Sequence, residues 1–389
     1  MKVYFAPCGI GLGHVGRCLE IAKKLTNKDC EILFSTYFDG LSVLKNEKFR
    51  FVEAPTFQYW CWPDGAVDPW RTLKWLSGKL LGIFLKQLKF EVKKITSFKP
   101  EVVVSDSRLS TVIAAKFTGR RTVTILNQFH VITPGFVHYR VLPTISDLFS
   151  FTFLASGWGL SDKIIVPDYP PPYSISGRNL RVPPALKRKV KYVGPILPVR
   201  PENLPKKEVL RKKFGFDNRP LVYAATSGPH WERTWLGKKF IKFFSGFPEK
   251  YQVVISLGLR GNPSINFKKN NLTVYGWVSE RFELLKACDL VVCRGGHTTL
   301  TQALAYGKPM VLIPTQEQTE QIYNAKTAVK LGVAKVIDQR WLSKEILLST
   351  IEEMFNDETY WKKAEKIMKI SSKFNAIETT TQIILGNKN

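Results

Sequence analysis

Cysteine and acidic residues are scarce in this chain of 389 residues. The six cysteines form no Cys-x-x-Cys pair, and no histidine stands at the spacing of a zinc ligand, so we expect neither a disulfide framework nor a structural zinc, and a reducing cytoplasm is the better setting. Only 32 Asp and Glu oppose 58 Lys and Arg, which leaves a formal net charge of +26. This imbalance predicts an anionic partner or surface, such as nucleic acid or acidic membrane.

Long apolar runs are missing as well. The longest uncharged run, Thr122 to Tyr139, contains amides, histidines and a proline and is too polar to span a membrane. The opening MKVYFAP lacks the apolar core of a signal peptide, and no short-period repeat indicates a solenoid. With 44% hydrophobic residues, the composition excludes wholesale disorder, and we expect a protein that is soluble or lies on a membrane surface.

Short β-branched runs alternate with amphipathic stretches of helix length, which predicts parallel sheets covered by helices. The length favours two domains. A proline-rich segment, Val193–Pro205, separates two such series and predicts the boundary. We expect domains at 1–196 and 197–371, with a C-terminal helix at about 372–389 packing back on the first. The expected strands are Lys2–Ala6, Glu31–Ser35, Glu101–Ser105, Arg121–Leu126, Pro220–Ala225, Gln252–Ser256, Leu272–Tyr275, Leu290–Cys293, Met310–Ile313 and Ala334–Ile337.

A glycine-rich loop follows the first expected strand. Gly9, Gly11 and Gly13 precede a helix expected from His14 to about Leu25, and such a helix N-terminus offers backbone N–H groups to an anion. Gly16 completes a GxGxxG pattern, but the next strand does not end in the acidic residue that a nicotinamide cofactor requires. His14 at the helix start could serve as a general base, or it could simply cap its own loop.

A second glycine turn is longer and more specific. The strand Leu290–Cys293 leads into Arg294-Gly295-Gly296 and then a helix opening with His297-Thr298-Thr299. The guanidinium and hydroxyl groups suit phosphate oxygens, and Gln302 follows one turn later. Farther along, Glu320, Gln321 and Asn324 supply the donors and acceptors that sugar and ribose hydroxyls need, although any one of them could instead belong to a solvated helix face.

These two loop regions resemble the glycosyltransferases of the two-Rossmann-domain (GT-B) type. The similar enzymes are the bacterial transferase that adds N-acetylglucosamine to lipid I and the eukaryotic two-subunit enzyme that completes dolichyl diphosphate-linked chitobiose. The resemblance spans nearly the whole chain and implies an α/β fold of two Rossmann-like domains facing each other across a cleft. It further implies an archaeal single-chain counterpart of the eukaryotic pair, at the cytoplasmic face of the membrane.

Site residues follow from the same resemblance. It implies that Gly9 to His14 face the acceptor diphosphate, with His14 as the base and Asn127 as a further acceptor-binding residue, and that Arg294 to Thr299 hold the nucleotide diphosphate. It assigns Glu320, Gln321 and Asn324 to the donor sugar, and it assigns Arg200, Ser227-Gly228 and Trp277-Val278 to the nucleotide. Departures from the family pattern occur at Gln302, where many members carry Glu, at Asn127 within Leu126-Asn127-Gln128-Phe129, and at the loop Thr226-Ser227-Gly228. These departures point away from the peptidoglycan enzyme itself.

The expected reaction is a single in-line displacement with inversion. The chain has no Asp-x-Asp motif, so we expect no metal and no cofactor, with UDP-N-acetylglucosamine as a substrate. The helix dipole, Arg294 and hydroxyl groups would stabilise the departing UDP. Asp106, after the strand Glu101–Ser105, is a reserve base that could otherwise cap the helix from Leu109.

A basic aromatic segment indicates where the lipid-linked acceptor is met. Trp60, Trp62, Trp70 and Trp75 precede or open a lysine-rich stretch that includes Lys79 and Lys86 and a single acidic residue, Glu91. Interfacial helices combine tryptophan with lysine in this way, so we expect docking on an anionic membrane. A core helix with a solvated basic face is the alternative.

Four alternatives to the implied function arise from the sequence. A nucleic-acid-binding protein would also be basic, but no zinc-finger or RNP-like fingerprint occurs, so we expect no nucleic-acid partner. A UDP-sugar epimerase of the same architecture, a transferase acting on another glycolipid and a catalytically silent scaffold are the other three.

Overall fold

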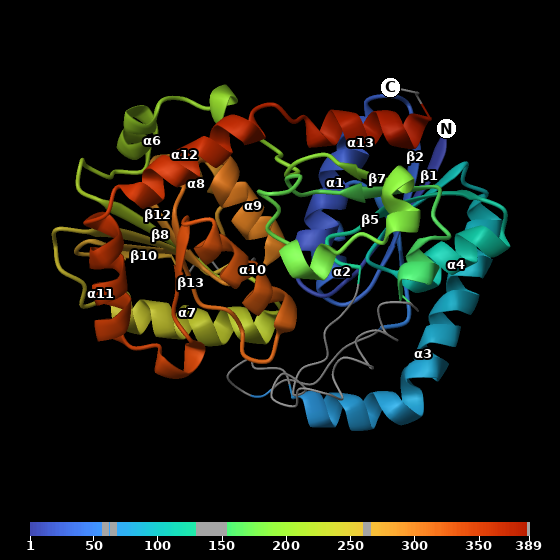
Figure 1. The fold of residues 1–389 in the computed structure, drawn as a ribbon, viewed down its shortest axis with the longest axis horizontal. Coiled ribbons are helices and arrows are strands. Elements are labelled where there is room, and N and C mark those ends of the chain that lie inside the picture. Colours follow the sequence, from blue (N-terminus) through green and yellow to red (C-terminus); the bar gives the residue numbers. More distant parts are fainter. Residues whose placement is uncertain (57–61, 63–67, 130–153, 260–265, 387–389) are drawn as a thin grey trace. The chain divides into compact units, whose positions relative to one another are not determined.

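The computed structural model describes residues 1–56, 62, 68–129, 154–259 and 266–386. The chain divides into two compact units. Unit 1 comprises Met1–Cys61, Val67–Ile196 and Phe374–Asn389, and unit 2 is built from Leu197–Lys373. The division after Ile196 falls inside the proline-rich segment, and the last helix, drawn in red in Figure 1, belongs to unit 1.

In the described part of unit 1, seven strands form one wholly parallel sheet. Their order across the sheet is β3 (Arg50–Glu53), β2 (Glu31–Thr36), β1 (Lys2–Pro7), β4 (Val102–Asp106), β5 (Arg121–Ile125), β6 (Lys163–Val166) and β7 (Val190–Tyr192). The helices are α1 (Gly13–Thr26), α2 (Asp39–Leu44), α3 (Pro69–Phe98), α4 (Leu109–Phe117) and α13 (Ala376–Leu385), with 3-10 turns η1 (Gly177–Leu180) and η2 (Pro184–Lys189).

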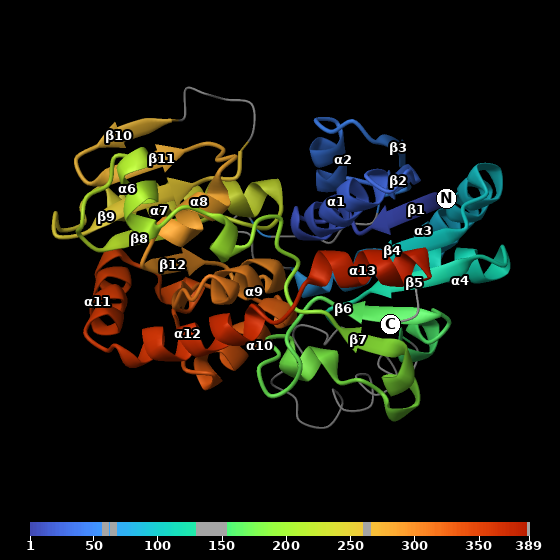
Figure 2. The ribbon, with the colours of Figure 1, turned by 90° about the horizontal axis from the view of Figure 1, so that it is seen from above.

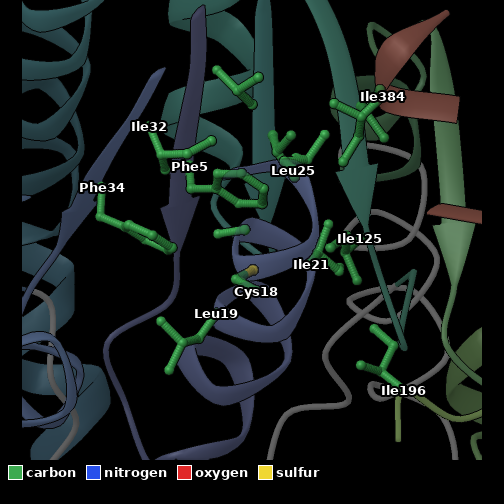
Figure 3. Close-up of a cluster of buried hydrophobic side chains, with 14 of the residues drawn as sticks. Phe5, Cys18, Leu19, Ile21, Leu25, Ile32, Phe34, Ile125, Ile196 and Ile384 are labelled. Carbon is green, nitrogen blue, oxygen red and sulfur yellow. The ribbon is translucent and has the colours of Figure 1, made fainter. Parts of the chain in front are cut away.

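Alternating side chains of β1 explain how helices cover both faces of this sheet. Val3 and Phe5 belong to a core with α1, whereas Tyr4 and Ala6 belong to a core on the opposite face that includes Ile95 of α3. Helix α13 closes the first core, because Ile384 packs among the side chains drawn in Figure 3. The expected helix at 372–389 is thus observed over Ala376–Leu385, in contact with α1.

Unit 2 repeats the design with a second seven-stranded sheet over its described residues. The order is β10 (Phe267–Lys269), β11 (Leu272–Tyr275), β9 (Gln252–Ser256), β8 (Leu221–Ala225), β12 (Leu290–Cys293), β13 (Met310–Leu312) and β14 (Ala334–Val336), with β10 alone antiparallel. The helices are α6 (Lys207–Lys213), α7 (His230–Phe244), α8 (Arg281–Ala287), α9 (His297–Ala305), α10 (Thr319–Lys330), α11 (Lys344–Phe355) and α12 (Thr359–Ser371), with 3-10 turns η3 (Pro201–Asn203) and η5 (Gln339–Trp341).

The fold matches the expected α/β class, with two Rossmann-like units. The strands β3, β6, β7 and β10 were not among those expected from the sequence. In three of them the pattern is weak, because β3 and β10 lie mostly exposed at sheet edges and β7 is three residues long with an exposed Lys191 at its centre. In both units the expected glycine turns leave the carboxyl ends of central parallel strands (Figure 2), the edge at which open α/β sheets bind ligands.

Candidate active site

The loop between β1 and α1 is held in a conformation that requires glycine. A Cβ atom on Gly9 would lie 1.9 Å from the carbonyl oxygen of Tyr37, and Gly11 has a φ of 70°. Gly16 is different, because a Cβ there would meet nothing within 4 Å. The N-cap residue of α1, Leu12, makes no side-chain capping bond, so the first turn of α1 faces a potential anion site. One loop N–H is already used, because Gly11 donates to Asp39 Oδ2 at 3.0 Å.

His14, in the first turn of α1, points its Nδ1 at a buried carboxylate. Nδ1 lies 2.7 Å from Oδ1 of Asp106, which is the last residue of β4, and the His14 side chain is 25% exposed. An ionised carboxylate can only accept, so Nδ1 carries the proton and Nε2 is left as the basic nitrogen. The 3.1 Å approach of Arg17 Nη2 to Nδ1 is then a close contact and not a hydrogen bond.

Arg17, one turn farther along α1, keeps Asp106 ionised. Its Nε and Nη2 lie 2.5 and 2.6 Å from the two oxygens of Asp106, which is fully buried. Burial by itself raises the pKa of Asp106, but the charges and hydrogen bonds of Arg17 and His14 outweigh it and hold that pKa well below its ordinary value. Arg17 Nη2 also donates to Asn127 Oδ1 at 3.2 Å, which ties the expected acceptor-site amide to the same network.

This geometry changes the role expected for Asp106. A carboxylate that is fully buried and held by an arginine is not available to take a proton from a substrate. It does not cap α4 either, because the N-cap residue there is Arg108 and that end has no side-chain capping bond. Asp106 instead fixes the tautomer and orientation of His14, as the carboxylate does in a hydrolase triad.

A second buried ion pair lies next to this network and was not expected from the sequence. Arg108 Nη2 donates to Glu91 Oε1 at 2.6 Å, and both side chains are buried. Ser35 Oγ donates to the same oxygen at 2.6 Å, and Arg108 Nη1 donates to the carbonyl of Ser35 at 2.8 Å. These bonds fasten α3 to the carboxyl ends of β2 and β4. The only available signal was the isolated Glu91 among the lysines of the basic segment.

In unit 2, the expected glycine turn is held by α10. A Cβ atom on Gly295 would lie 2.4 Å from the carbonyl oxygen of Gln321. The side-chain oxygen of Gln321 accepts from Gly295 N at 3.2 Å and from Thr315 N at 3.0 Å, while Asn324 Nδ2 donates to the Gly295 carbonyl at 3.0 Å. Gln321 and Asn324 therefore shape this turn, and Gly296 at the N-cap of α9 has no side chain to occupy the helix N-terminus.

The position of Arg294 differs from the expectation that its guanidinium meets phosphate oxygens. The side chain is fully buried, and Nη1 donates to the Ile313 carbonyl at 3.1 Å and to Gln339 Oε1 at 2.5 Å. Nε lies 4.0 Å from Oε2 of Glu232, a buried carboxylate in the first turn of α7 that also accepts from Thr315 Oγ1 at 2.9 Å. Arg294 thus braces the loops from within unit 2. No sequence pattern indicated a role for Glu232.

Most of the remaining expected donor residues follow the adjacent parallel strands β8, β12 and β13, at the carboxyl ends of these strands. Gly228 has a φ of 96° and packs against Glu232, and Glu320 is half-buried in the first turn of α10. Trp277 and the buried Val278 follow β11, whereas Arg200 donates to the Ser372 carbonyl at 2.8 Å and pairs with Glu202. The others are Ser227 after β8 and His297, Thr298, Thr299 and Gln302 on α9, with His297 and Gln302 buried.

The expected membrane residues lie on α3. Lys79 and Lys86 are exposed, and so are Leu81 and Leu85. Trp70 and Trp75 fall within α3, but their side chains and the whole of Trp60 lie outside the described residues. None of the described helices combines the length and the apolar character needed to cross a bilayer. The described residues also contain no group of three or more His, Cys, Asp or Glu placed to hold a metal ion, and the five described cysteines are free thiols.

The chain is similar in sequence to known glycosyltransferases. Residues 233–380 match the glycosyltransferase family 28 C-terminal domain. An uncharacterized glycosyltransferase of Methanosarcina acetivorans is 29% identical over 394 residues, covering 99% of this chain and 98% of the relative. The UDP-N-acetylglucosamine–N-acetylmuramyl-(pentapeptide) pyrophosphoryl-undecaprenol N-acetylglucosamine transferase of a Sulfurihydrogenibium species is 30% identical over 368 residues, covering 91% of this chain and 90% of the relative.

Solved structures show the same fold at low sequence identity. MurG of Acinetobacter baumannii aligns over 99% of both chains with a TM-score of 0.60 and 15% identity. The calicheamicin glycosyltransferase CalG4 aligns over 99% of this chain and 97% of its own with a TM-score of 0.66 and 16% identity. Because the match to the Sulfurihydrogenibium enzyme spans nearly the whole of both proteins, the chain belongs to glycosyltransferase family 28 and is a GT-B glycosyltransferase.

Proposed function

We propose that this enzyme transfers N-acetylglucosamine from UDP-N-acetylglucosamine to a sugar carried on a polyprenyl diphosphate, such as dolichyl diphosphate-linked N-acetylglucosamine in N-glycan precursor assembly. The observation that carries the proposal is the His14–Asp106 contact, since it presents a basic Nε2 beside an uncapped helix N-terminus. Support for the sugar and the lipid comes from the printed activity of the Sulfurihydrogenibium relative. The departure at Asn127, in the expected acceptor site, favours an acceptor other than the peptidoglycan precursor.

The proposed reaction is an inverting displacement at the anomeric carbon of the donor sugar. The acceptor hydroxyl oxygen forms the new bond to that carbon while the bond from the carbon to the UDP oxygen breaks. The hydroxyl proton moves to His14 Nε2, and Asp106 stabilises the imidazolium that results. The departing electron pair stays on the diphosphate of UDP.

On this proposal, backbone groups and hydroxyls stabilise the departing diphosphate without a metal. Gly296 and the first turn of α9 offer backbone N–H groups, and Thr298 and Thr299 offer hydroxyls. In this proposal Arg294, whose side chain is fully buried, supports the turn from the interior. Gln302, Glu320 and the loop at Ser227-Gly228 are proposed to contact the ribose and the sugar of the donor.

Helix α3 is the proposed contact with the membrane that carries the acceptor. Its buried face consists of Gln87, Glu91, Ile95 and Phe98, spaced three or four residues apart. Its exposed side chains include the apolar Leu81 and Leu85 as well as lysines, a combination found in interfacial helices. The cytoplasmic face of the cell membrane is the proposed location, with the protein bound peripherally. The lysines on the exposed face of α3 that follow Leu85 are Lys86, Lys89 and Lys93.

The direct test incubates the enzyme with a panel of UDP-sugars and short lipid-diphosphate-sugar acceptors and analyses the products by mass. The proposal predicts one added N-acetylglucosamine on an acceptor that carries diphosphate-linked N-acetylglucosamine. Conversion of UDP-N-acetylglucosamine to an isomer without acceptor would instead indicate an epimerase. Transfer only to acceptors without a lipid diphosphate would contradict the proposed substrate class.

A further inference from the structure

A basic pocket lies in unit 1 at the end of the sheet opposite the candidate active site. It has a volume of about 420 Å³ and is lined by the first residues of β5, β6 and β7, by the end of η2 and by the end of α13. Figure 2 shows α13 in red beside these strands. Because the strands are parallel and the glycine loop and Asp106 stand at their carboxyl ends, this pocket is distinct from the candidate active site.

The pocket wall carries five cationic side chains and no carboxylate. Two of the cations are fixed by backbone carbonyls: Lys189 Nζ donates to Gly159 and Ser161 at 2.8 and 3.0 Å, and Arg121 donates to Ile383 and Ile384. The other three are Lys163, Arg188 and Lys191.

These three cations have no hydrogen-bond or ion-pair partner among the described residues. The neighbouring carboxylate of Asp162 is occupied, since it accepts from the backbone N–H of Thr122 at 2.7 Å. Glu378, one turn from Gln382 on α13, pairs with Lys24 and Lys28. Like charges gathered without counter-charges repel one another, so a ligand of at least two negative charges would bind favourably here.

Phosphate is the anion that suits this wall. A guanidinium donates in a planar fork that matches phosphate oxygens, and ammonium groups add point charges. The apolar residues Ile164, Val190 and Ile383 also line the pocket. We propose that the pocket binds a di- or polyphosphate group, carried either by a soluble compound or by a lipid headgroup.

The test measures binding of inorganic pyrophosphate by calorimetry at about 0.15 M salt, with saturating UDP present to occupy the donor site. The pocket variant is Lys163→Gln/Lys191→Gln, and the control Lys45→Gln/Lys48→Gln removes two exposed, unpaired lysines from another part of unit 1. The net charge of the two variants is equal, so non-specific attraction to this basic protein is matched. We expect the pocket variant to bind about tenfold more weakly or worse, and the control to bind like the wild type.

Vesicles that contain a lipid with a diphosphate headgroup distinguish the two sources of the phosphate. Weaker binding of these vesicles by the pocket variant than by the control identifies a lipid headgroup, whereas equal vesicle binding by the two variants with lost pyrophosphate binding identifies a soluble ligand. Equal pyrophosphate affinity in the pocket and control variants, or no saturable binding by the wild type, would overturn the proposal. If the double variant unfolds, the single Arg188→Gln change of an exposed side chain is compared with the single control Lys45→Gln, which has the same net charge.

Discussion

The carboxylate of Asp106 joins side chains that lie far apart in the sequence. His14 and Arg17 come from α1, and Asn127, after β5, is reached through Arg17. Because the carboxylate is fully buried, its charge is tolerated only while Arg17 stays in place. The orientation of the proposed base therefore depends on a residue that touches no substrate, and Arg17 is a positioning residue.

Replacing Arg17 with Met should lower the free energy of unfolding by about 3–5 kcal/mol, because it leaves a buried carboxylate without its partner. Arg50→Met is the matched control. Arg50 pairs with Glu31 at 2.9 Å, but its side chain is 70% exposed, and exposed pairs contribute at most about 1 kcal/mol. Urea denaturation of both variants measures the difference, and equal losses would contradict the account.

Acid should remove the contribution of Asp106 to stability. Its folded-state pKa lies below the unfolded value of about 3.9. The stabilisation is therefore complete above that value and is lost as the pH falls below it. The stability difference between the wild type and Asp106→Asn should be constant from about pH 6 to 5 and should shrink below about pH 4. Thermal unfolding at each pH measures it, and a difference that grows in acid would contradict the sign.

At the scale of elements, the two glycine turns are held by backbone groups of neighbouring loops. Gly9 lies against the carbonyl of Tyr37 and Gly295 against that of Gln321. A side chain at either position would push apart a loop and the element that supports it, so these glycines are structural requirements of the turns. The third glycine of the GxGxxG pattern, Gly16, has open space around it.

Gly9→Ala and Gly16→Ala should therefore change stability in opposite directions. The first forces the loop away from Tyr37 and should cost about 1–3 kcal/mol or more. The second replaces a helical glycine without any steric conflict and should gain about 0.5–1 kcal/mol. Melting temperatures of the two variants check the prediction. A loss of stability in Gly16→Ala would contradict the open space around Gly16.

Local sequence patterns predicted much of the fold but few of the contacts between buried side chains. The strands with dense β-branched residues and the glycine turns were predictable, because both depend on adjacent residues. Arg17 was not, since an arginine within an amphipathic helix usually faces water, and only packing against Asp106, which is 89 residues away, makes it a buried partner. The buried position of Arg294 was missed for a similar reason. A glycine turn in the sequence does not show whether the adjacent arginine side chain faces the ligand site or the protein interior.

At the scale of the whole molecule, the formal charge of +26 is spread over surfaces with different roles. The lysines of α3 follow exposed leucines, which suits a bilayer. The cationic side chains around the basic pocket of unit 1 line a concave surface. A single electrostatic property of the chain thus supports two separate proposals, and each needs its own variant.

Vesicle binding through α3 should require its exposed leucines as well as low salt. Leu81→Ser/Leu85→Ser should weaken binding to anionic vesicles by about tenfold or more, and salt near 0.5 M should weaken binding of the wild type because it screens the lysines. Val209→Ser/Val329→Ser, at exposed apolar positions of unit 2, is the control. Vesicle sedimentation measures both, and equal binding by the two double variants would exclude α3 as the docking surface.

The central claim is that His14 removes the proton of the acceptor hydroxyl while the donor is held in unit 2. Single-turnover transfer by His14→Ala, measured together with its affinity for UDP, tests this claim most directly. The account predicts that turnover falls by about 10²- to 10⁴-fold while UDP affinity stays unchanged. Turnover equal to that of the wild type, or a loss that arises wholly from weaker UDP binding, would contradict it.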